Sequence, residues 1–225
     1  VIIDYGCSYD KEAIDAQAAA VVKSIAYIDI PKKPGNGLVE RVRPRQDILA
    51  QLRSVASSAN PDVAFLEYGY IAHYAQAFPE CKIIFDTQNL QSDIDLQIAK
   101  LPTINLTRQV YAGLVLKASQ YHEQKYLPRC DSVLAVSEID LAHYKRQIPL
   151  TKLQLVPNFI ELSRYVHKGA PIKSTESPHI VFTGSMDAFQ NQQAGDYLLE
   201  NIWPRVLQDL PYCQLLMVGI IPPQL

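Results

Sequence analysis

The hydrophobic positions of the chain fall into two alternating patterns. Short, nearly continuous apolar runs recur along it, and longer segments between them repeat apolar residues at helical spacing. Such runs are typical of parallel strands that helices cover on both faces. The alternation therefore predicts an α/β fold with a doubly wound parallel sheet. The predicted strands are "VIID", "IAYIDI", "PDVAFLEYG", "CKIIFD", "SVLAVS" and "LQLVP".

The segments between these runs carry helix signals. Asp10 is placed to cap a helix over "KEAIDAQAAAVVKS", and residues 44–58 put four apolar side chains on one face. The longest helix is expected over about residues 103–129. A further helix is expected over residues 138–147, with Ser137 as its cap.

The pattern breaks after the strand in "LQLVPNFIE", which stops at Pro157 and Asn158. A stretch dense in Gly, Pro, Ser and Lys follows, "KGAPIKSTESP", which is typical of a linker. The α/β alternation then restarts with "HIVFTG", a helix and "CQLLMVG". The sequence predicts a first domain over residues 1–157, a hinge or linker over 158–178 and the start of a second domain over 179–225. Pro157 and Asn158, at the junction of the first two, are the predicted hinge residues.

Composition places the chain among ordinary globular proteins. It is 48% hydrophobic and 20% charged with a formal net charge of -2, which favours neither nucleic acid nor an anionic surface as main partner. The four cysteines are far apart and form no C-x-x-C pair, which predicts reduced, buried thiols in a cytoplasmic protein. No run is long enough to cross a membrane, and no membrane span or signal peptide is expected.

Candidate binding residues follow from the sheet itself. In an open parallel sheet, ligands bind beyond the carboxyl ends of the strands, so the residues after each apolar run are the candidates. Taken singly, each of these residues is also of a type that is common in ordinary turns. The strand-end residues are Glu67 to Tyr70, Asp86 to Asn89, Ser137-Glu138, Pro157-Asn158, Gly184-Ser185 and Gly219.

Four blocks of sequence resemble one enzyme family. "CDSVLAVSEIDLAHY", "KLQLVPNFIE", "IVFTGSMDAFQN" and "IWPRVLQDLPYCQLLMVG" resemble, in order and spacing, the retaining GT-B glycosyltransferases of family 4. "PDVAFLEYGY", "IIFDTQNLQSD" and "YHEQKYLPRCD" are similar to the matching pieces of the N-terminal domain. The resemblance covers about residues 60–219. It implies a GT-B fold: a Rossmann-like N-terminal domain and an incomplete second Rossmann-like domain.

The resemblance implies a donor side and an acceptor side. Gly184, Ser185 and Asn191 would approach the diphosphate of a nucleotide sugar, since a small residue before a helix lets backbone N–H groups meet phosphate. Family members often carry cations just after this glycine, whereas this chain has "SMDAFQN". Glu67 and Tyr70 would line the acceptor pocket, because a carboxylate and aromatic faces suit polyhydroxyl ligands.

The run "DTQN" resembles a family motif in which a histidine lies near the reacting sugar; here that position is Gln88, followed by Asn89. An amide donates hydrogen bonds but does not take up a proton near neutral pH, so Gln88 and Asn89 are expected to act as the catalytic residues by positioning sugar and not by transferring a proton. Asp86 either caps the following helix or touches substrate. The pair His122-Glu123 is expected to be structural.

The predicted function is hexose transfer, without metal or cofactor, from a nucleotide-diphosphate sugar to a saccharide or lipid-linked acceptor, as in cell-surface polysaccharide synthesis. No nucleic acid is expected as partner, and a peripheral position at the inner face of the plasma membrane is compatible with it. The family's paired acidic residues of the donor site have no match in this chain, so it is expected to be an inactive fragment on its own. A non-catalytic carbohydrate-binding module and a GT-B sugar-nucleotide epimerase are the alternatives.

Overall fold

The structure, a computed structural model, describes residues 2–5, 25–28, 37–67, 69–101, 105–164, 178–186 and 188–219. The chain divides into two compact units, Val1–Ile160 and Glu161–Leu225. The division falls inside the segment predicted as the hinge. The predicted cap at Asp10, the thiol of Cys7 and the side chain of Tyr68 lie outside the described residues.

Unit 1 contains a parallel sheet of four strands in the order β3-β4-β5-β6, and a separate parallel pair, β1-β2. All six strands predicted for this part of the chain are present. The elements of unit 1 are β1 (Ile2–Tyr5), β2 (Ile25–Ile28), α2 (Gly37–Val42), α3 (Gln46–Ala59), β3 (Val63–Glu67), a 3₁₀ helix (Ala72–Ala77), β4 (Lys82–Asp86), α4 (Gln91–Ala99), α5 (Leu106–Tyr126), a 3₁₀ turn (Leu127–Arg129), β5 (Ser132–Ala135), α6 (Glu138–Tyr144), a 3₁₀ turn (Leu150–Lys152) and β6 (Leu153–Leu155).

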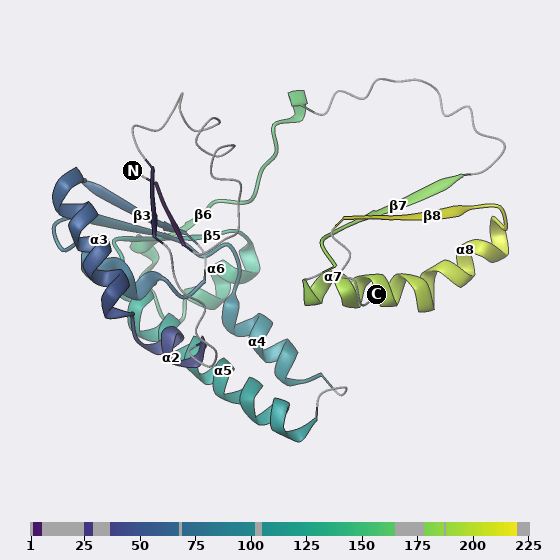
Figure 1. Ribbon diagram of the computed structural model, residues 1–225, viewed down its shortest axis with the longest axis horizontal. Coiled ribbons are helices and arrows are strands. Elements are labelled where there is room, and N and C mark those ends of the chain that lie inside the picture. The colour runs from purple at the N-terminus through teal and green to yellow at the C-terminus, as the bar shows by residue number, and fades with distance from the viewer. Residues whose placement is uncertain are drawn as a thin grey trace. The chain divides into compact units, whose positions relative to one another are not determined.

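One face of this sheet carries the core of unit 1. Along β3, Ala64 and Leu66 are buried while Val63 and Phe65 are about half exposed, at 49% and 54%. The buried side chains of α3 join the same core, and Figure 1 shows α3 and α5 on one side of β3–β6. Helices on both faces were predicted. The described helices cover one face, so the doubly wound arrangement remains a prediction.

Two predicted boundaries in unit 1 shift. The long helix α5 begins at Leu106 and not near residue 103, because the side chain of Asn105 accepts a hydrogen bond from Arg108 N (3.0 Å) and so caps the helix. Strand β6 ends at Leu155 and not at Pro157, and the last bond to its neighbour is from Val156 N to Ala135 O (2.8 Å). Ser137 caps α6 as predicted, through a bond from Asp140 N (3.1 Å).

The described residues of unit 2 form a 3₁₀ turn (Leu162–Arg164) followed by one β–α–β unit (Figure 1). The strands β7 (His179–Thr183) and β8 (Gln214–Val218) pair in parallel, and the described residues of unit 2 bury only Met186 and Cys213 among large hydrophobic side chains. The predicted single helix is interrupted. It comprises α7 (Phe189–Tyr197), one π turn (Leu198–Ile202) and α8 (Trp203–Asp209), because Pro204 in the helix has no N–H to bond the preceding turn.

Candidate functional site

Three predicted strand-end residues meet at the carboxyl edge of β3 and β4. Glu67 and Asp86 are register partners in the two strands, so their carboxylates end at the same edge. Gln88 Nε2 lies between them, 3.0 Å from Glu67 Oε1 and 2.9 Å from Asp86 Oδ2. Since both neighbours are acceptors, only the nitrogen end of the amide fits between them. The amide therefore bridges two carboxylates that would otherwise repel each other.

The backbone of Gln88 is in the left-handed region, with φ of 54°. This conformation is uncommon for a residue with a side chain. Here Gln88 N donates to Asp86 Oδ1 (3.2 Å), which holds the turn closed. Neither Gln88 Oε1 nor Glu67 Oε2 forms a hydrogen bond with a described residue, which leaves two acceptors at this edge.

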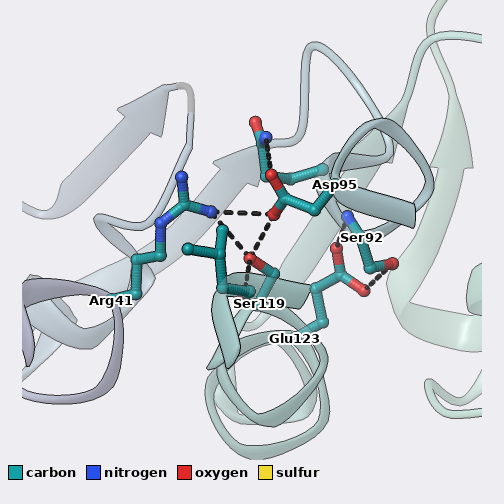
Figure 2. A network of polar contacts seen from close by, with 7 residues as sticks. Arg41, Ser92, Asp95, Ser119 and Glu123 are labelled. Carbon is teal, nitrogen blue, oxygen red and sulfur yellow. Dashed lines mark hydrogen bonds and ion pairs between the residues drawn. The ribbon is translucent and has the colours of Figure 1, made fainter. Parts of the chain in front are cut away.

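Asp86 does not cap the following helix, which corrects one of the two roles expected for it. The N-cap position of α4 is Leu90, which offers no side-chain acceptor. Glu123 on α5 supplies the cap instead: its Oε1 accepts from Ser92 N (2.9 Å) and its Oε2 accepts from Ser92 Oγ (2.7 Å) (Figure 2). Asp86 is engaged with Gln88, so its carboxylate is directed to the strand-end turn.

The cap by Glu123 gives the predicted structural role of the His122-Glu123 pair a specific form. Glu123 is 5% exposed, and its burial raises the pKa of its carboxyl while the bonds from Ser92 oppose that rise. A carboxylate at a helix N-terminus is also favoured by the helix dipole. Sequence analysis could place the pair on a packed face of α5 but could not identify Ser92 as its partner, since the two are on different helices.

A second buried network lies one turn earlier on α5 (Figure 2). Arg41 Nη1 donates to Asp95 Oδ2 and to Ser119 Oγ, both at 2.8 Å, and Ser119 Oγ donates to Asp95 Oδ2 at 2.5 Å. Burial lowers the pKa of the Arg41 guanidinium, and the contact with Asp95 opposes this. The same guanidinium lies over the ring of Tyr70, 3.7 Å from its centroid.

That stacking changes the interpretation of Tyr70. One face of its ring is covered by Arg41, and its edge meets His122 with ring centroids 6.1 Å apart. Tyr70 and Asn89 both line a small internal cavity of about 10 Å³, roughly the room one water needs. Glu67 and Gln88 do not line it. The four acceptor-side candidates therefore form two groups, Glu67 with Gln88 at the edge of the sheet and Tyr70 with Asn89 around the cavity.

His122 is paired with a second buried histidine. His73 Nδ1 and His122 Nε2 are 3.0 Å apart, and the two rings are 2% and 1% exposed. Burial lowers the pKa of His73 to about 4; burial, followed by the neighbouring His73 and Arg41, lowers the pKa of His122 to about 3. Both rings are therefore neutral at pH 7. His73 Nε2 is buried and has no hydrogen-bond partner among the described residues.

On the donor side, two glycines are in direct backbone contact. Gly184 N donates to Val218 O (3.0 Å), and Gly219 has φ of 149°. A Cβ on Gly219 would lie 1.8 Å from Gly184 O, so no other residue fits there. The carboxyl ends of β7 and β8 are thereby joined at the loop that the resemblance assigns to the diphosphate.

The other two donor-side candidates bond to each other, Ser185 from the loop and Asn191 from the first turn of α7. Asn191 Nδ2 donates to Ser185 O (2.9 Å), and its amide carbon lies 3.2 Å from where a Cβ on Gly184 would be. In the first turn of α7, Asn191 N and Gln192 N both donate to Ala188 O, so the N–H groups of Phe189 and Gln190 are the ones left to meet an anion. No Lys or Arg occurs between Lys173 and Arg205. Asn191 therefore fastens the loop, and any anion bound there would rely on backbone amides.

The remaining predictions concern the hinge, the thiols, metals and membranes. Pro157 and Asn158 lie in a segment without regular structure. Among the described cysteines, Cys130 and Cys213 are buried and free as predicted, whereas Cys81 is free and only half-buried. Among the residues that the structure describes, no three side chains of the metal-binding types gather into one group, and no helix has the length and apolar character needed to cross a membrane.

No protein-family model matches the chain, and a search of curated proteins finds none that is significantly similar.

Proposed function

We propose that this chain is part of a retaining hexosyltransferase of the GT-B type, in which unit 1 holds the acceptor side and unit 2 begins the donor side. The reaction breaks the bond between an anomeric carbon and a nucleotide diphosphate and forms one to an acceptor hydroxyl. The proposal rests on the resemblance in sequence blocks and on a parallel α/β sheet that is compatible with such a fold.

The observation that carries the proposal is the bridge of Glu67, Asp86 and Gln88. Carboxylates and amides that are already fixed by one another suit adjacent sugar hydroxyls, because each hydroxyl both donates and accepts. The Gln88 amide nitrogen is used by the carboxylates, so Gln88 Oε1 and Glu67 Oε2 accept from a hydroxyl. The bridge lies at the carboxyl edge of the sheet, where open α/β sheets bind ligands.

Gln88 has a positioning role in this scheme. Its amide does not take the proton that the acceptor hydroxyl loses, so that proton passes to the oxygen of the departing nucleotide diphosphate. A sugar held by two fixed acceptors keeps its reacting hydroxyl in one orientation. Such positioning speeds the reaction because the hydroxyl is already directed at the anomeric carbon. Metal independence and a saccharide or lipid-linked acceptor follow from the resemblance, as does the expectation that this chain alone does not turn over a sugar nucleotide.

A second candidate is a carbohydrate-binding module without transfer activity. The specific observation in its favour is the Gly184 loop, where Asn191 is engaged by Ser185 and no cation is near in sequence. Such a module would bind saccharide equally well with or without a nucleotide diphosphate. The transferase proposal instead predicts that a nucleotide diphosphate binds at the loop of unit 2.

The test is equilibrium binding to the full chain. Glucose, galactose, mannose and N-acetylglucosamine are titrated with and without UDP, GDP or ADP, with binding read from ligand saturation-transfer NMR. Glu67→Gln and Gln88→Ala are expected to weaken saccharide binding at least fivefold, because each removes an acceptor or the group that fixes it.

Gln97→Ala is the matched control, since Gln97 Nε2 also donates to a carboxylate, Asp93 Oδ2 at 2.8 Å, on an exposed face of α4. Saccharide binding by the parent chain that Gln88→Ala leaves unchanged would contradict the proposed site. Saccharide binding without any nucleotide diphosphate binding would favour the module, and the absence of both would overturn the proposed function.

A further inference from the structure

The outer side of α5 is apolar although it faces solvent. The buried residues of this helix, which include Ala112, Ser119 and His122, mark the side that packs on the rest of unit 1. Because an α-helix turns by about 100° per residue, a second row of side chains falls on the opposite side, within about a quarter of the circumference. This outer stripe consists of Leu106, Val110, Leu114, Lys117 and Tyr121. Its four large hydrophobic side chains are, in that order, 75%, 59%, 51% and 41% exposed.

The N-terminal end of α5 extends past the helix that packs beside it (Figure 1). The helices α4 and α5 are antiparallel, since their hydrogen bonds join Ser92 to Glu123 and Asp95 to Ser119. Helix α4 ends about one turn after Asp95, whereas α5 continues, and its residues 106–111 are all exposed. A helix owes most of its stability in water to the packing of its apolar face, so an unpacked apolar end is expected to be covered by a partner.

The exposed surface of α5 is also positively charged. The helix carries three cations, Arg108, Lys117 and Lys125, and its one acidic residue, Glu123, is buried in the cap of α4. Lys117 lies within the outer stripe, and Lys125 Nζ donates to Tyr121 Oη (2.5 Å) at the C-terminal end of the stripe. The whole chain has a formal net charge of -2, so this helix is a local concentration of positive charge.

We propose that the outer stripe docks on a bilayer surface that contains anionic lipid, with the axis of α5 parallel to that surface. Leu106, Val110 and Leu114 enter the boundary between headgroups and acyl chains, which is where the apolar face of an interfacial helix lies. The ring of Tyr121 suits the headgroup level, because its hydroxyl stays in contact with polar groups. Lys117 reaches the lipid phosphates while its methylene stem lies along the apolar side chains.

Charge decides between lipid and a second copy of this chain as the partner. Pairing of two copies through their outer stripes would bring Lys117 and Lys125 of both chains together, and α5 has no exposed carboxylate to neutralise them. Like charges that face one another oppose association. A surface of anionic lipid supplies the missing negative charge and attracts each lysine near it. The outer stripe therefore fits an anionic bilayer better than it fits itself.

The test is flotation of the full chain with vesicles of phosphatidylcholine, either alone or with about 30% phosphatidylglycerol. The chain is expected to bind the anionic vesicles at least tenfold more tightly, and added salt is expected to weaken that binding because it screens the lysines. Leu106→Gln combined with Leu114→Gln is expected to weaken binding to anionic vesicles at least tenfold, since two apolar side chains no longer enter the interface. Lys117→Gln is expected to weaken it about fivefold.

The matched controls lie on or near α6. Ile139→Gln combined with Leu150→Gln removes two comparably exposed apolar side chains, and Lys145→Gln removes an exposed cation; neither control is expected to change vesicle binding. Glutamine is a good helix former, so circular dichroism and thermal unfolding of the stripe variants are expected to match the parent chain. Gln88→Ala is expected to bind vesicles as the parent chain does, which separates this surface from the proposed sugar site.

Three results would overturn the proposal. The first is no flotation with anionic vesicles, and the second is an equal loss of binding in the Ile139→Gln, Leu150→Gln control. The third is a dimer in analytical ultracentrifugation that dissociates in the Leu106→Gln, Leu114→Gln variant, because that result would assign the outer stripe to a second copy of the chain.

Discussion

The two units share a β–α–β plan but differ in how much of it is buried. Unit 1 packs a continuous core that includes Ile48, Phe85, Val133 and Tyr144, each at most 2% exposed. In unit 2, Val181 and Leu216 are the middle residues of β7 and β8, yet they are 53% and 45% exposed. The comparison shows that an apolar strand pattern predicts a strand but not its coverage, which depends on how many helices and strands stack on it.

The candidate sites differ in the same way. The bridge of Glu67, Asp86 and Gln88 lies at the carboxyl edge of a four-stranded sheet, and one face of that sheet packs on the core. The Gly184 loop is attached to two strands, and its geometry depends on one glycine contact and one asparagine bond. The acceptor-side geometry is therefore expected to survive perturbation better than the donor-side loop.

The largest expected effect is a cavity in the core of unit 1. Phe85→Ala removes a 2% exposed ring from the central strand β4 and is expected to lower the free energy of unfolding of unit 1 by about 3–5 kcal/mol. Met217→Ala on β8, which is only half-buried, is expected to leave that transition unchanged. The two variants are compared by urea unfolding. Trp203 fluorescence follows unit 2, and residue-specific NMR follows unit 1. If Met217→Ala lowered the free energy of unfolding of unit 1 as much as Phe85→Ala does, the two units would share one core.

The next effect is acid sensitivity confined to unit 1. The folded pKa values of His73 and His122 are lowered to about 4 and about 3, so the unfolded chain binds more protons than the folded one below pH 6.5. Their contribution to the free energy of unfolding is full above pH 6.5 and is lost as pH falls, by about 2 kcal/mol for each histidine between pH 7 and pH 5.

The double variant His73→Leu with His122→Leu is expected to flatten this pH dependence in urea unfolding of unit 1, because replacing both hydrogen-bond partners by apolar groups costs little. His179→Leu, at an exposed position of β7, serves as control and is expected to keep it. A double variant that is as acid-sensitive as the parent chain would contradict the assignment.

A smaller effect is expected from one methyl group in unit 2. Gly219→Ala places Cβ against Gly184 O and requires a φ of 149° that alanine does not tolerate, so the end of β8 separates from the loop at a cost of about 1–3 kcal/mol. Hydrogen exchange at Gly184 N, which donates to Val218 O, is expected to accelerate at least tenfold.

Gly113→Ala on α5 is the matched substitution in unit 1. Its Cβ would meet nothing within 4 Å, so the better helix propensity of alanine is expected to stabilise unit 1 by about 1 kcal/mol. Unchanged exchange at Gly184 in the Gly219→Ala variant would show that the glycine contact does not hold the loop.

The smallest effect on stability is expected at the bridge itself. Gln88→Gly relieves the backbone strain of a left-handed φ of 54°, which stabilises the fold by about 1 kcal/mol. It also removes two hydrogen bonds to carboxylates, whose net contribution is of similar size and opposite sign. Thermal unfolding of this variant is expected to stay within about 1 kcal/mol of the parent, while saccharide binding is lost. Gln97→Gly, inside α4, is expected to destabilise by about 1 kcal/mol with binding retained. A large loss of stability in Gln88→Gly would mean that the bridge is structural.

The sequence predicted the parallel strands because their apolar runs are bounded by turn residues, as "CKIIFD" is by Thr87 and Gln88. Local capping was equally accessible at Ser137, whose bond partner Asp140 is three residues away. The cap of α4 was not accessible, since Glu123 reaches Ser92 from another helix. Asp86, the nearer acidic residue, was therefore a wrong candidate for it.

Contacts between distant residues account for what the sequence could not predict about the sites. The strand-end rule selected Glu67 and Gln88 separately, and the register of β3 with β4 is what brings them to 3.0 Å. The same rule selected Tyr70, but Arg41, 29 positions earlier by sequence numbering, covers its ring.

The most direct test of the account is a ¹H–¹⁵N chemical-shift map of the full chain during titration with glucose, galactose, mannose and N-acetylglucosamine. At least one sugar is predicted to perturb the side-chain NH₂ of Gln88 and the backbone amides of Glu67 and Asp86 most strongly, with the side-chain NH₂ of Gln97 unmoved. Perturbations elsewhere in the chain, or none with any of the four sugars, would contradict the claim that this edge of the sheet holds a sugar.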